Sequence, residues 1–177
     1  MRLTREDLRA RKGDRVAFRE RARLPISLIL DDVQGTYNQG AIFRLCDAFM
    51  LEQVHFCGAA LQTQHRRFLK AARGTHGWVP YTHQRDIFAV LDEYRTSGYQ
   101  LIAVEQCEGS VAIHEISFAP RICLILGGEL SGISENVLEC VDIIAELPSD
   151  GMANSLNVAM SAGIAVYAAY AALYARS

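Results

Sequence analysis

The feature that most constrains the fold is an alternation of short apolar runs with stretches of helical periodicity. Strand-like runs occur at 24–31, 53–57, 78–81, 99–105, 121–126 and 143–147, and helical stretches at 39–50, 64–73, 85–96 and 134–140. This alternation predicts an α/β fold, with a mostly parallel sheet that has helices on both faces. A chain of 177 residues suits one such domain with a self-sufficient core.

The segment 155–175 is almost entirely small and apolar, so it has to be weighed as a membrane span. Ala dominates over Leu and Ile, Asn157 and Ser161 lie in its first two turns, and Tyr167, Tyr170 and Tyr174 recur at helical spacing. These features favour a helix that is buried on most sides, partly by a second subunit.

Charge is distributed unevenly along the chain. Residues 1–23 carry nine Arg or Lys against four acids, whereas residues 24–177 carry nine against sixteen. We therefore expect a basic N-terminal arm, 1–23, followed by one α/β domain, 24–177. The arm either binds the phosphates of a nucleic acid or forms a solvated charged helix. The candidate phosphate-binding residues are Arg9, Arg11, Lys12, Arg15 and Arg19.

The five cysteines are widely scattered, with no C-x-x-C pair and no His at metal-ligand spacing. Neither a zinc site nor a disulfide framework is predicted, and no metal is expected. Several cysteines lie in apolar runs, where a free thiol acts as a small buried hydrophobe. Because the first eight residues also lack the apolar core of a secretion signal, we expect a cytoplasmic protein.

Common cofactor and nucleophile motifs fail on inspection. No G-x-G-x-x-G follows a predicted strand, and Gly35 and Gly40 have the spacing of a phosphate-binding loop without its Lys and Ser/Thr. In residues 128–132, GELSG, the central position of a nucleophile elbow is Leu130 rather than Ser.

Three other segments carry polar residues in informative places. In the first, residues 38–44 (NQGAIFR), Asn38 stands where a helix N-cap belongs and Gly40 lies in the opening turn. Arg44 could hold a phosphate with its planar fork of donors, or it could be an ordinary surface ion-pair residue.

The second segment, residues 122–132, is an apolar strand that runs into a Gly-rich turn containing Glu129. Ligands of open α/β sheets bind at the carboxyl ends of strands, and Glu129 lies just beyond one. Alternatively, Glu129 merely caps the short helix that follows.

The third segment, residues 147–157 (LPSDGMANSLN), leaves a strand and enters the C-terminal helix. Asn154 or Ser155 could serve as its N-cap, but Asn157, which we expect inside the helix, would then have no structural reason. A polar residue inside an apolar helix suggests a binding site.

Together these segments resemble the three motifs of the SpoU (TrmH-like) RNA methyltransferases of the SPOUT superfamily: N-x-G-A-I-x-R, an apolar strand ending G-x-E-x-x-G, and P-x-x-G-x-x-x-S-L-N-V. The resemblance extends from about Pro25 to the C-terminal helix. It departs from the usual pattern at Gly128, where Asn or Gln is common, and at 149–150, where the family is more apolar.

The resemblance implies a SPOUT fold with a C-terminal deep trefoil knot, bound S-adenosyl-L-methionine, and a homodimer whose second subunit helps complete the substrate site. The implied activity is methylation of a ribose 2'-hydroxyl in RNA, with tRNA favoured over rRNA. The implied cofactor-binding residues are Val104, Glu105, Leu126, Gly127, Gly128, Leu147 and Leu156, and the implied catalytic residues are Arg44, Asn38, Glu129, Ser155 and Asn157.

Two other functions stay open at this point. One is an RNA-binding protein that keeps the fold without catalysis, although the five implied catalytic residues argue against it. The other is methylation of a small molecule or protein, which the basic arm disfavours only weakly.

Overall fold

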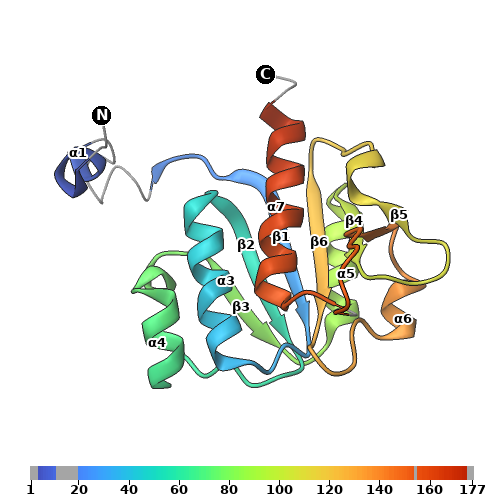
Figure 1. Cartoon of the computed structure of the whole chain (residues 1–177), viewed down its shortest axis with the longest axis horizontal. Coiled ribbons are helices and arrows are strands. Elements are labelled where there is room, and N and C mark those ends of the chain that lie inside the picture. Colours follow the sequence, from blue (N-terminus) through green and yellow to red (C-terminus); the bar gives the residue numbers. More distant parts are fainter. Residues whose placement is uncertain (1–3, 11–19, 154, 175–177) are drawn as a thin grey trace.

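A parallel sheet forms the centre of the protein (Figure 1). The structure is a computed structural model that describes residues 4–10, 20–153 and 155–174. In this part of the chain the sheet has seven strands in the order β3-β2-β1-β6-β4-β7-β5, and every neighbouring pair is parallel. The strands are β1 (Leu24–Asp31), β2 (Leu51–Cys57), β3 (Tyr81–Gln84), β4 (Gln100–Val104), β5 (Val111–Ala112), β6 (Ile122–Gly127) and β7 (Ile143–Glu146).

Helices cover both faces of this sheet, as the alternation predicts. One face carries α3 (Thr36–Ala48), α4 (Arg66–Ala72) and α7 (Val158–Tyr174), and the other carries α5 (Ile87–Thr96) and α6 (Glu135–Leu138). The short elements α1 (Arg5–Ala10), η1 (Thr75–Gly77) and η2 (Ile113–Glu115) complete the described helices. The predicted fold class, α/β with a mostly parallel sheet, is confirmed.

The central strand β1 shows why its sequence is apolar at nearly every position. Leu28 and Leu30 pack into the cluster that contains α3 and α7, whereas Ile29 packs into the cluster that contains α5. All three side chains are at most 1% exposed. A strand buried on both faces needs a continuous apolar run rather than an alternating one.

One predicted strand differs from the structure in position, and one observed strand was not predicted. The apolar run at 78–81 is not a strand: Trp78 and Val79 pack into the core between η1 and β3, and the strand itself begins at Tyr81. Apolar side chains in a loop that packs against the core give the same sequence pattern as apolar side chains in a buried strand. The two-residue strand β5 lies at the sheet edge and was not predicted at all.

The start of α3 also differs. The helix begins at Thr36 and has Gly35 as its N-cap, so Asn38 lies inside the first turn and is not a cap. Gly35 accepts the first helical bond through its carbonyl oxygen, from the backbone N–H of Gln39 at 2.9 Å. Asn38 is therefore left with its whole side-chain amide available for other partners.

The cysteines agree with the expectation of free thiols. All five are unpaired, and Cys46, Cys57 and Cys123 are buried. Burial raises the pKa of Cys57 to about 12 and raises the pKa values of Cys46 and Cys123 as well. These three residues act as small hydrophobes of the core.

Of the described helices, none has the length and apolar character that crossing a membrane requires. The trefoil knot that the family resemblance implies stays a prediction.

Gly40 marks the closest approach of α4 to α3. A Cβ atom at this position would lie 2.6 Å from the carbonyl oxygen of Phe68 and 3.0 Å from the Cβ of Ala71. We expect Gly40→Ala to push the helices apart and lower the free energy of unfolding by about 1–2 kcal/mol, because overpacking outweighs the better helix propensity of Ala. Urea denaturation measures the change.

Gly77→Ala is the matched control, because a Cβ there has no neighbour within 4 Å. It should change the free energy of unfolding by less than about 0.5 kcal/mol. Equal stability of Gly40→Ala and wild type would mean that α3 and α4 separate without cost.

Candidate active site

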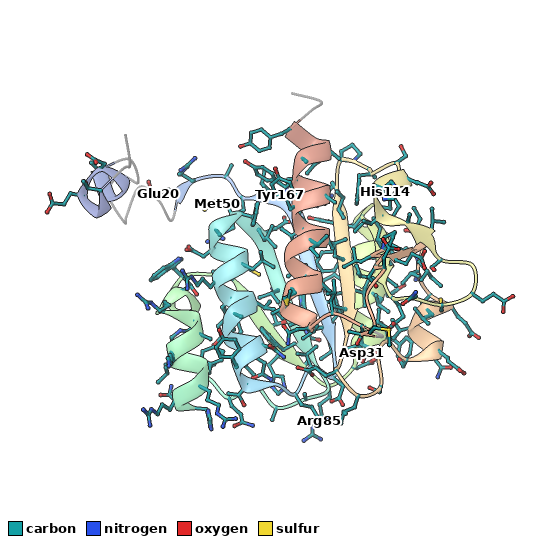
Figure 2. All side chains as sticks on the ribbon, viewed as in Figure 1. Glu20, Asp31, Met50, Arg85, His114 and Tyr167 are labelled. Atoms are coloured by element: carbon teal, nitrogen blue, oxygen red, sulfur yellow. The ribbon has the colours of Figure 1, made fainter. Side chains whose placement is uncertain are left out.

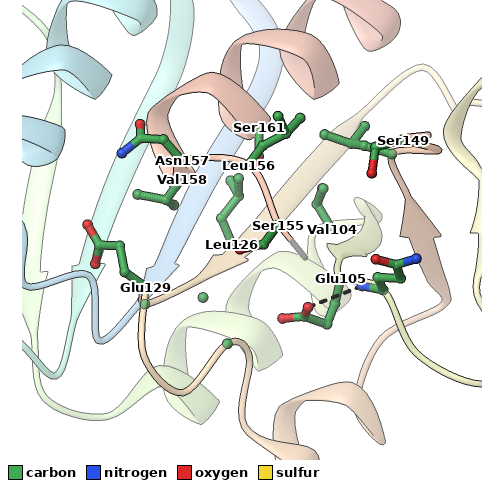
Figure 3. Close-up of a pocket in the computed structure, with 15 residues that line it drawn as sticks. Val104, Glu105, Leu126, Glu129, Ser149, Ser155, Leu156, Asn157, Val158 and Ser161 are labelled. Atoms are coloured by element: carbon green, nitrogen blue, oxygen red, sulfur yellow. Dashed lines mark hydrogen bonds between the residues drawn. The ribbon is translucent and has the colours of Figure 1, made fainter. Parts of the chain in front are cut away.

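A cavity of about 400 Å³ lies at the carboxyl ends of β6, β4 and β7 (Figure 3). Val104 and Glu105 line it from the end of β4, and Leu126, Gly127 and Gly128 line it from the end of β6. Leu147 and Leu156 line it from the segment between β7 and α7. All seven implied cofactor-binding residues therefore meet around one cavity, at the sheet edge where open α/β folds bind ligands.

The glycine-rich turn after β6 forms one wall of the cavity. Gly132 has a φ of +64°, and a Cβ there would lie 2.6 Å from Oε2 of Glu105. The same Oε2 accepts a hydrogen bond from the backbone N–H of Ile133 at 3.0 Å. The turn consequently exposes backbone rather than side chains to a ligand, and Glu105 holds it in place.

Asn38 connects this turn to the C-terminal helix. Its Nδ2 donates to Oε1 of Glu129, and its Oδ1 accepts from Nδ2 of Asn157 at 3.1 Å. Asn38 is only 9% exposed, whereas Glu129 is exposed at the rim of the cavity. The amide orientations follow from this donor and acceptor pattern.

Asn157 has a structural role that could not be seen in the sequence. The helix α7 starts at Val158, and Oδ1 of Asn157 accepts from the backbone N–H of Ala159 at 3.1 Å. Asn157 is therefore the N-cap of α7 rather than a residue inside it, so the expectation that Asn154 or Ser155 caps the helix at 155 is wrong. The other end of the same amide reaches Asn38, which makes Asn157 part of the site as well.

The remaining motif-three residue, Ser155, also lines the cavity beside Leu156 (Figure 3). Among the described lining residues the charged side chains are Glu105 and Glu129. The cavity is consequently acidic, and its apolar walls are Val104, Leu126, Leu147, Leu156 and Val158. Within the described residues, no three His, Cys, Asp or Glu side chains come together in a group that could hold a metal ion.

Arg44 is the implied catalytic residue that the structure does not bring to this cavity. It lies in a second groove, between α3 and α4, together with Tyr37, Lys70 and Arg73. Six positions along a helix turn the direction of a side chain by about 600°, or about 240° net, so Asn38 and Arg44 leave α3 in different directions. Within one chain, Arg44 therefore lies apart from Glu129, Ser155 and Asn157, which line the cavity.

The structure does not test the candidate RNA-binding residues of the arm. Arg11, Lys12, Arg15 and Arg19 lie outside the described residues, as does the side chain of Arg9. Arg23, at the end of the arm, donates to the carbonyl oxygens of Leu51 and Trp78 at 3.0 and 3.1 Å. Its partial burial lowers the pKa of its guanidinium.

Sequence reasoning missed Gln106, Ser149 and Ser161, which also line the cavity. Gln106 directly follows the predicted strand 99–105. Its position at the carboxyl end of a strand could therefore have identified it as a candidate site residue. Ser161 lies four residues after Asn157, one helical turn further along the same side of α7. Ser149 could not be identified from spacing alone.

The fold and the cavity define a parallel α/β domain with a ligand site at the carboxyl ends of three neighbouring strands. The chain belongs to the SpoU rRNA Methylase family, whose model matches residues 25–167.

Relatives of known activity support this assignment. The chain is 29% identical over 156 residues to the tRNA (guanosine(18)-2'-O)-methyltransferase of Aquifex aeolicus, covering 85% of this chain and 71% of that protein. It is 27% identical over 144 residues to the enzyme of the same name from Escherichia coli K12, covering 81% of this chain but only 62% of that protein. The solved structure of the A. aeolicus TrmH/SpoU tRNA modifying enzyme superposes with a TM-score of 0.78 at 27% identity, covering 89% of this chain and 80% of that one.

The contact between Asn38 and Glu129 can be tested through stability. Asn38→Asp replaces the donor that faces Glu129 by a second carboxylate but keeps an acceptor for Asn157. We expect the free energy of unfolding at pH 7 to fall by about 1–2 kcal/mol, because a hydrogen bond is exchanged for repulsion at a partly solvated site. Chemical denaturation measures the loss.

Adding Glu129→Gln to Asn38→Asp supplies an amide that can donate to the new Asp, and should restore a good part of the stability. A double-mutant cycle separates this coupling from independent effects. If the losses of unfolding free energy were strictly additive, the contact between Asn38 and Glu129 would not be what holds the turn against α3.

Proposed function

We propose that this protein transfers a methyl group from S-adenosyl-L-methionine to a ribose 2'-hydroxyl of RNA, with tRNA as the first candidate substrate and rRNA as the second. The observation that supports the proposal is that the second and third motif segments line one cavity at the carboxyl edge of β6, β4 and β7, and that Asn38 of the first segment hydrogen-bonds to two of its lining residues, Glu129 and Asn157. The tRNA activity named for the relatives from A. aeolicus and E. coli favours tRNA.

The residues of the cavity fit the cofactor. Its volume of about 400 Å³ lies in the range of small-molecule sites. Leu126, Leu147 and Leu156 provide an apolar surface for a nucleobase, and the glycine turn presents backbone donors and acceptors. The carboxylates of Glu105 and Glu129 suit a sulfonium cation, whose positive charge the acidic cavity stabilises. When bound, S-adenosyl-L-methionine supplies the activated methyl group.

The protein's own contribution is positioning and charge. The chain of hydrogen bonds through Asn38 fixes Glu129 at the rim and ties it to the start of α7. Such fixed geometry aligns the ribose hydroxyl with the methyl group, which supplies much of the rate of an in-line transfer. Ser155 lines the same cavity, and its hydroxyl can donate or accept a hydrogen bond.

As the methyl group is transferred, the 2'-hydroxyl gives up its proton to solvent water, and Arg44 stabilises the negative charge that develops on the 2'-oxygen. A guanidinium stays protonated in proteins, so it acts through charge and its fork of donors rather than as a base. Because Arg44 lies in the second groove, we propose that the cavity is completed by Arg44 of the partner subunit. This arrangement requires a homodimer.

The exposed side of α7 supports dimerisation (Figure 2). Met160, Ile164 and Tyr167 are 58%, 45% and 61% exposed and recur at helical spacing. Tyr167 also packs edge-on against Phe49, with ring centroids 6.3 Å apart. An apolar stripe with an aromatic residue is typical of a subunit interface.

The basic arm, 1–23, is proposed as a separate unit that adds RNA affinity through Arg9, Arg11, Lys12, Arg15 and Arg19. Its net positive charge supports this role beside the acidic domain, 24–177. A cytoplasmic location likewise stays a proposal.

Arg44→Ala tests the proposed chemistry. We expect transfer of labelled methyl groups to unmodified total tRNA to fall by more than about 100-fold, because the charge on the oxygen loses its stabilising group. Arg44→Lys should also fail, since an ammonium lacks the planar fork. The affinity for S-adenosyl-L-methionine, measured by calorimetry, should stay near that of wild type.

Near-normal turnover of Arg44→Ala would remove Arg44 from the reaction. Wild-type protein that binds RNA but neither binds the cofactor nor transfers methyl groups would be the non-catalytic RNA-binding protein instead. Transfer to a small molecule or protein, and not to RNA, would establish the other alternative.

Tyr167→Glu tests the dimer. A charge in the apolar stripe should dissociate the dimer or prevent folding, and a folded monomer should lose RNA methylation while keeping secondary structure. Light scattering at micromolar concentration gives the mass. Phe88→Glu is the matched control, because Phe88 is 44% exposed on α5, the helix on the opposite face of the sheet. A wild-type monomer with full activity would contradict both the interface and the shared site.

A further inference from the structure

Positive charge on the described surface gathers around α3 and α4. Residues 53–85 contain five Arg or Lys and no Asp or Glu, although residues 24–177 as a whole are acidic. Arg66, Arg67, Lys70 and Arg73 come from α4 and its C-terminal end, and all four are exposed. Figure 2 shows side chains that end in nitrogen along the outer side of α4. This concentration is not expected of an acidic domain whose charges are spread for solubility alone.

A groove of about 390 Å³ between α3 and α4 receives part of this charge. Arg44 reaches it from α3, and Lys70 and Arg73 reach it from the α4 side. Its remaining surface is small and apolar, with Ala41 and Ala71 among the lining residues. The groove therefore has cationic walls and room for an anionic chain.

The cations of this groove are not neutralised by the protein. Arg44, Lys70 and Arg73 form no ion pair or side-chain hydrogen bond with any other residue that the structure describes. Like charges held close together repel each other, and a bound polyanion relieves that repulsion while releasing its counterions.

Tyr37 adds a second kind of recognition. It lines the same groove and is 58% exposed, so its ring is accessible to a ligand in the groove. Proteins that bind single-stranded nucleic acids combine exposed aromatic rings with cations. The bases stack on the rings, and the phosphates bind the cations. A free anion would need no such ring.

We infer that the α3–α4 groove and the exposed side of α4 bind the sugar-phosphate backbone of the RNA beside the nucleotide that is methylated. Lys70 and Arg73 hold neighbouring phosphates, and Tyr37 stacks on an unpaired base. Since Arg44 lies in the same groove, the bound strand is delivered to the group that is proposed to act on its ribose. The inference rests on the proposed function and names the surface that it uses for RNA.

Lys70→Gln and Arg73→Gln test this surface separately. The probe is fluorescein-labelled unmodified tRNA, and fluorescence anisotropy gives its affinity for the full chain at several salt concentrations. Each variant should weaken binding by about three- to tenfold and reduce the salt slope by about one, as the loss of one phosphate contact predicts. In methyl transfer, KM for RNA should rise while kcat at saturating RNA is retained.

Arg95→Gln is the matched control. Arg95 lies on α5, on the opposite face of the sheet, and donates to the carbonyl oxygen of Cys140, a contact that a Gln amide can also make. It removes the same charge and should leave RNA affinity and salt slope close to those of wild type. Tyr37→Leu should weaken RNA binding without changing the salt slope, because it removes stacking but no charge.

Unchanged affinity and slope for Lys70→Gln and Arg73→Gln, in protein that still methylates RNA, would overturn the inference. Equal losses for Arg95→Gln would overturn it too, because net charge rather than this groove would then control binding. A fall in affinity for S-adenosyl-L-methionine, measured in parallel, would show that the variants act through the fold. Failure of wild type to methylate any RNA would instead contradict the proposed function, and the anisotropy would still decide whether this groove binds RNA.

Discussion

The side-chain amide of Asn38 is the contact on which the rest of the site depends. It joins α3 to a carboxylate 91 positions further along the chain and to an N-cap 119 positions further along. Asn38 can contact both partners at once because an amide both donates and accepts: its Nδ2 donates to the carboxylate of Glu129, and its Oδ1 accepts from Asn157, whose own Oδ1 caps α7. Asp in this position would lose the donor, and Leu would lose both functions.

This linkage explains why the glycine turn and the start of α7 form one wall of the cavity. The turn follows β6 and has few side chains of its own. Its position therefore depends on the hydrogen bond that Glu105 accepts from Ile133 and on the one that Asn38 donates to Glu129. The segment before α7 has little regular structure, and the cap of the helix fixes its end. Hydrogen bonds between distant segments thus provide the rigidity that the turn lacks.

The alternation of apolar runs and helical stretches predicted the fold class, because it is a local signal, and the family resemblance supplied the seven residues that the structure places around the cavity. Sequence reasoning failed where the signal depends on tertiary packing. Trp78 and Val79 resemble a strand because they are buried, and Asn38 resembles a cap because it precedes a helical pattern, although Gly35 takes that place. Asn157 was correctly associated with the site but assigned to the helix interior, since helix starts cannot be located to within a turn from periodicity. The separation of Asn38 and Arg44 was available from helical geometry, but a shared motif suggested a shared location.

Helix α3 consequently separates two environments of opposite charge. On one side, Asn38 hydrogen-bonds to Glu129 and Asn157, which line an acidic cavity that suits a cationic methyl donor. On another side, Arg44 lines a cationic groove that suits a polyanion. The cationic methyl donor and the anionic RNA would each be attracted to its own site and to the other ligand. Within one chain, however, the two sites are separate. Transfer needs the ribose oxygen and the methyl carbon in contact, and in the proposed homodimer the groove of one subunit would lie at the cavity of the other. The proposed homodimer would then be a requirement for catalysis, because it would join two half-sites that lie on separate sides of α3.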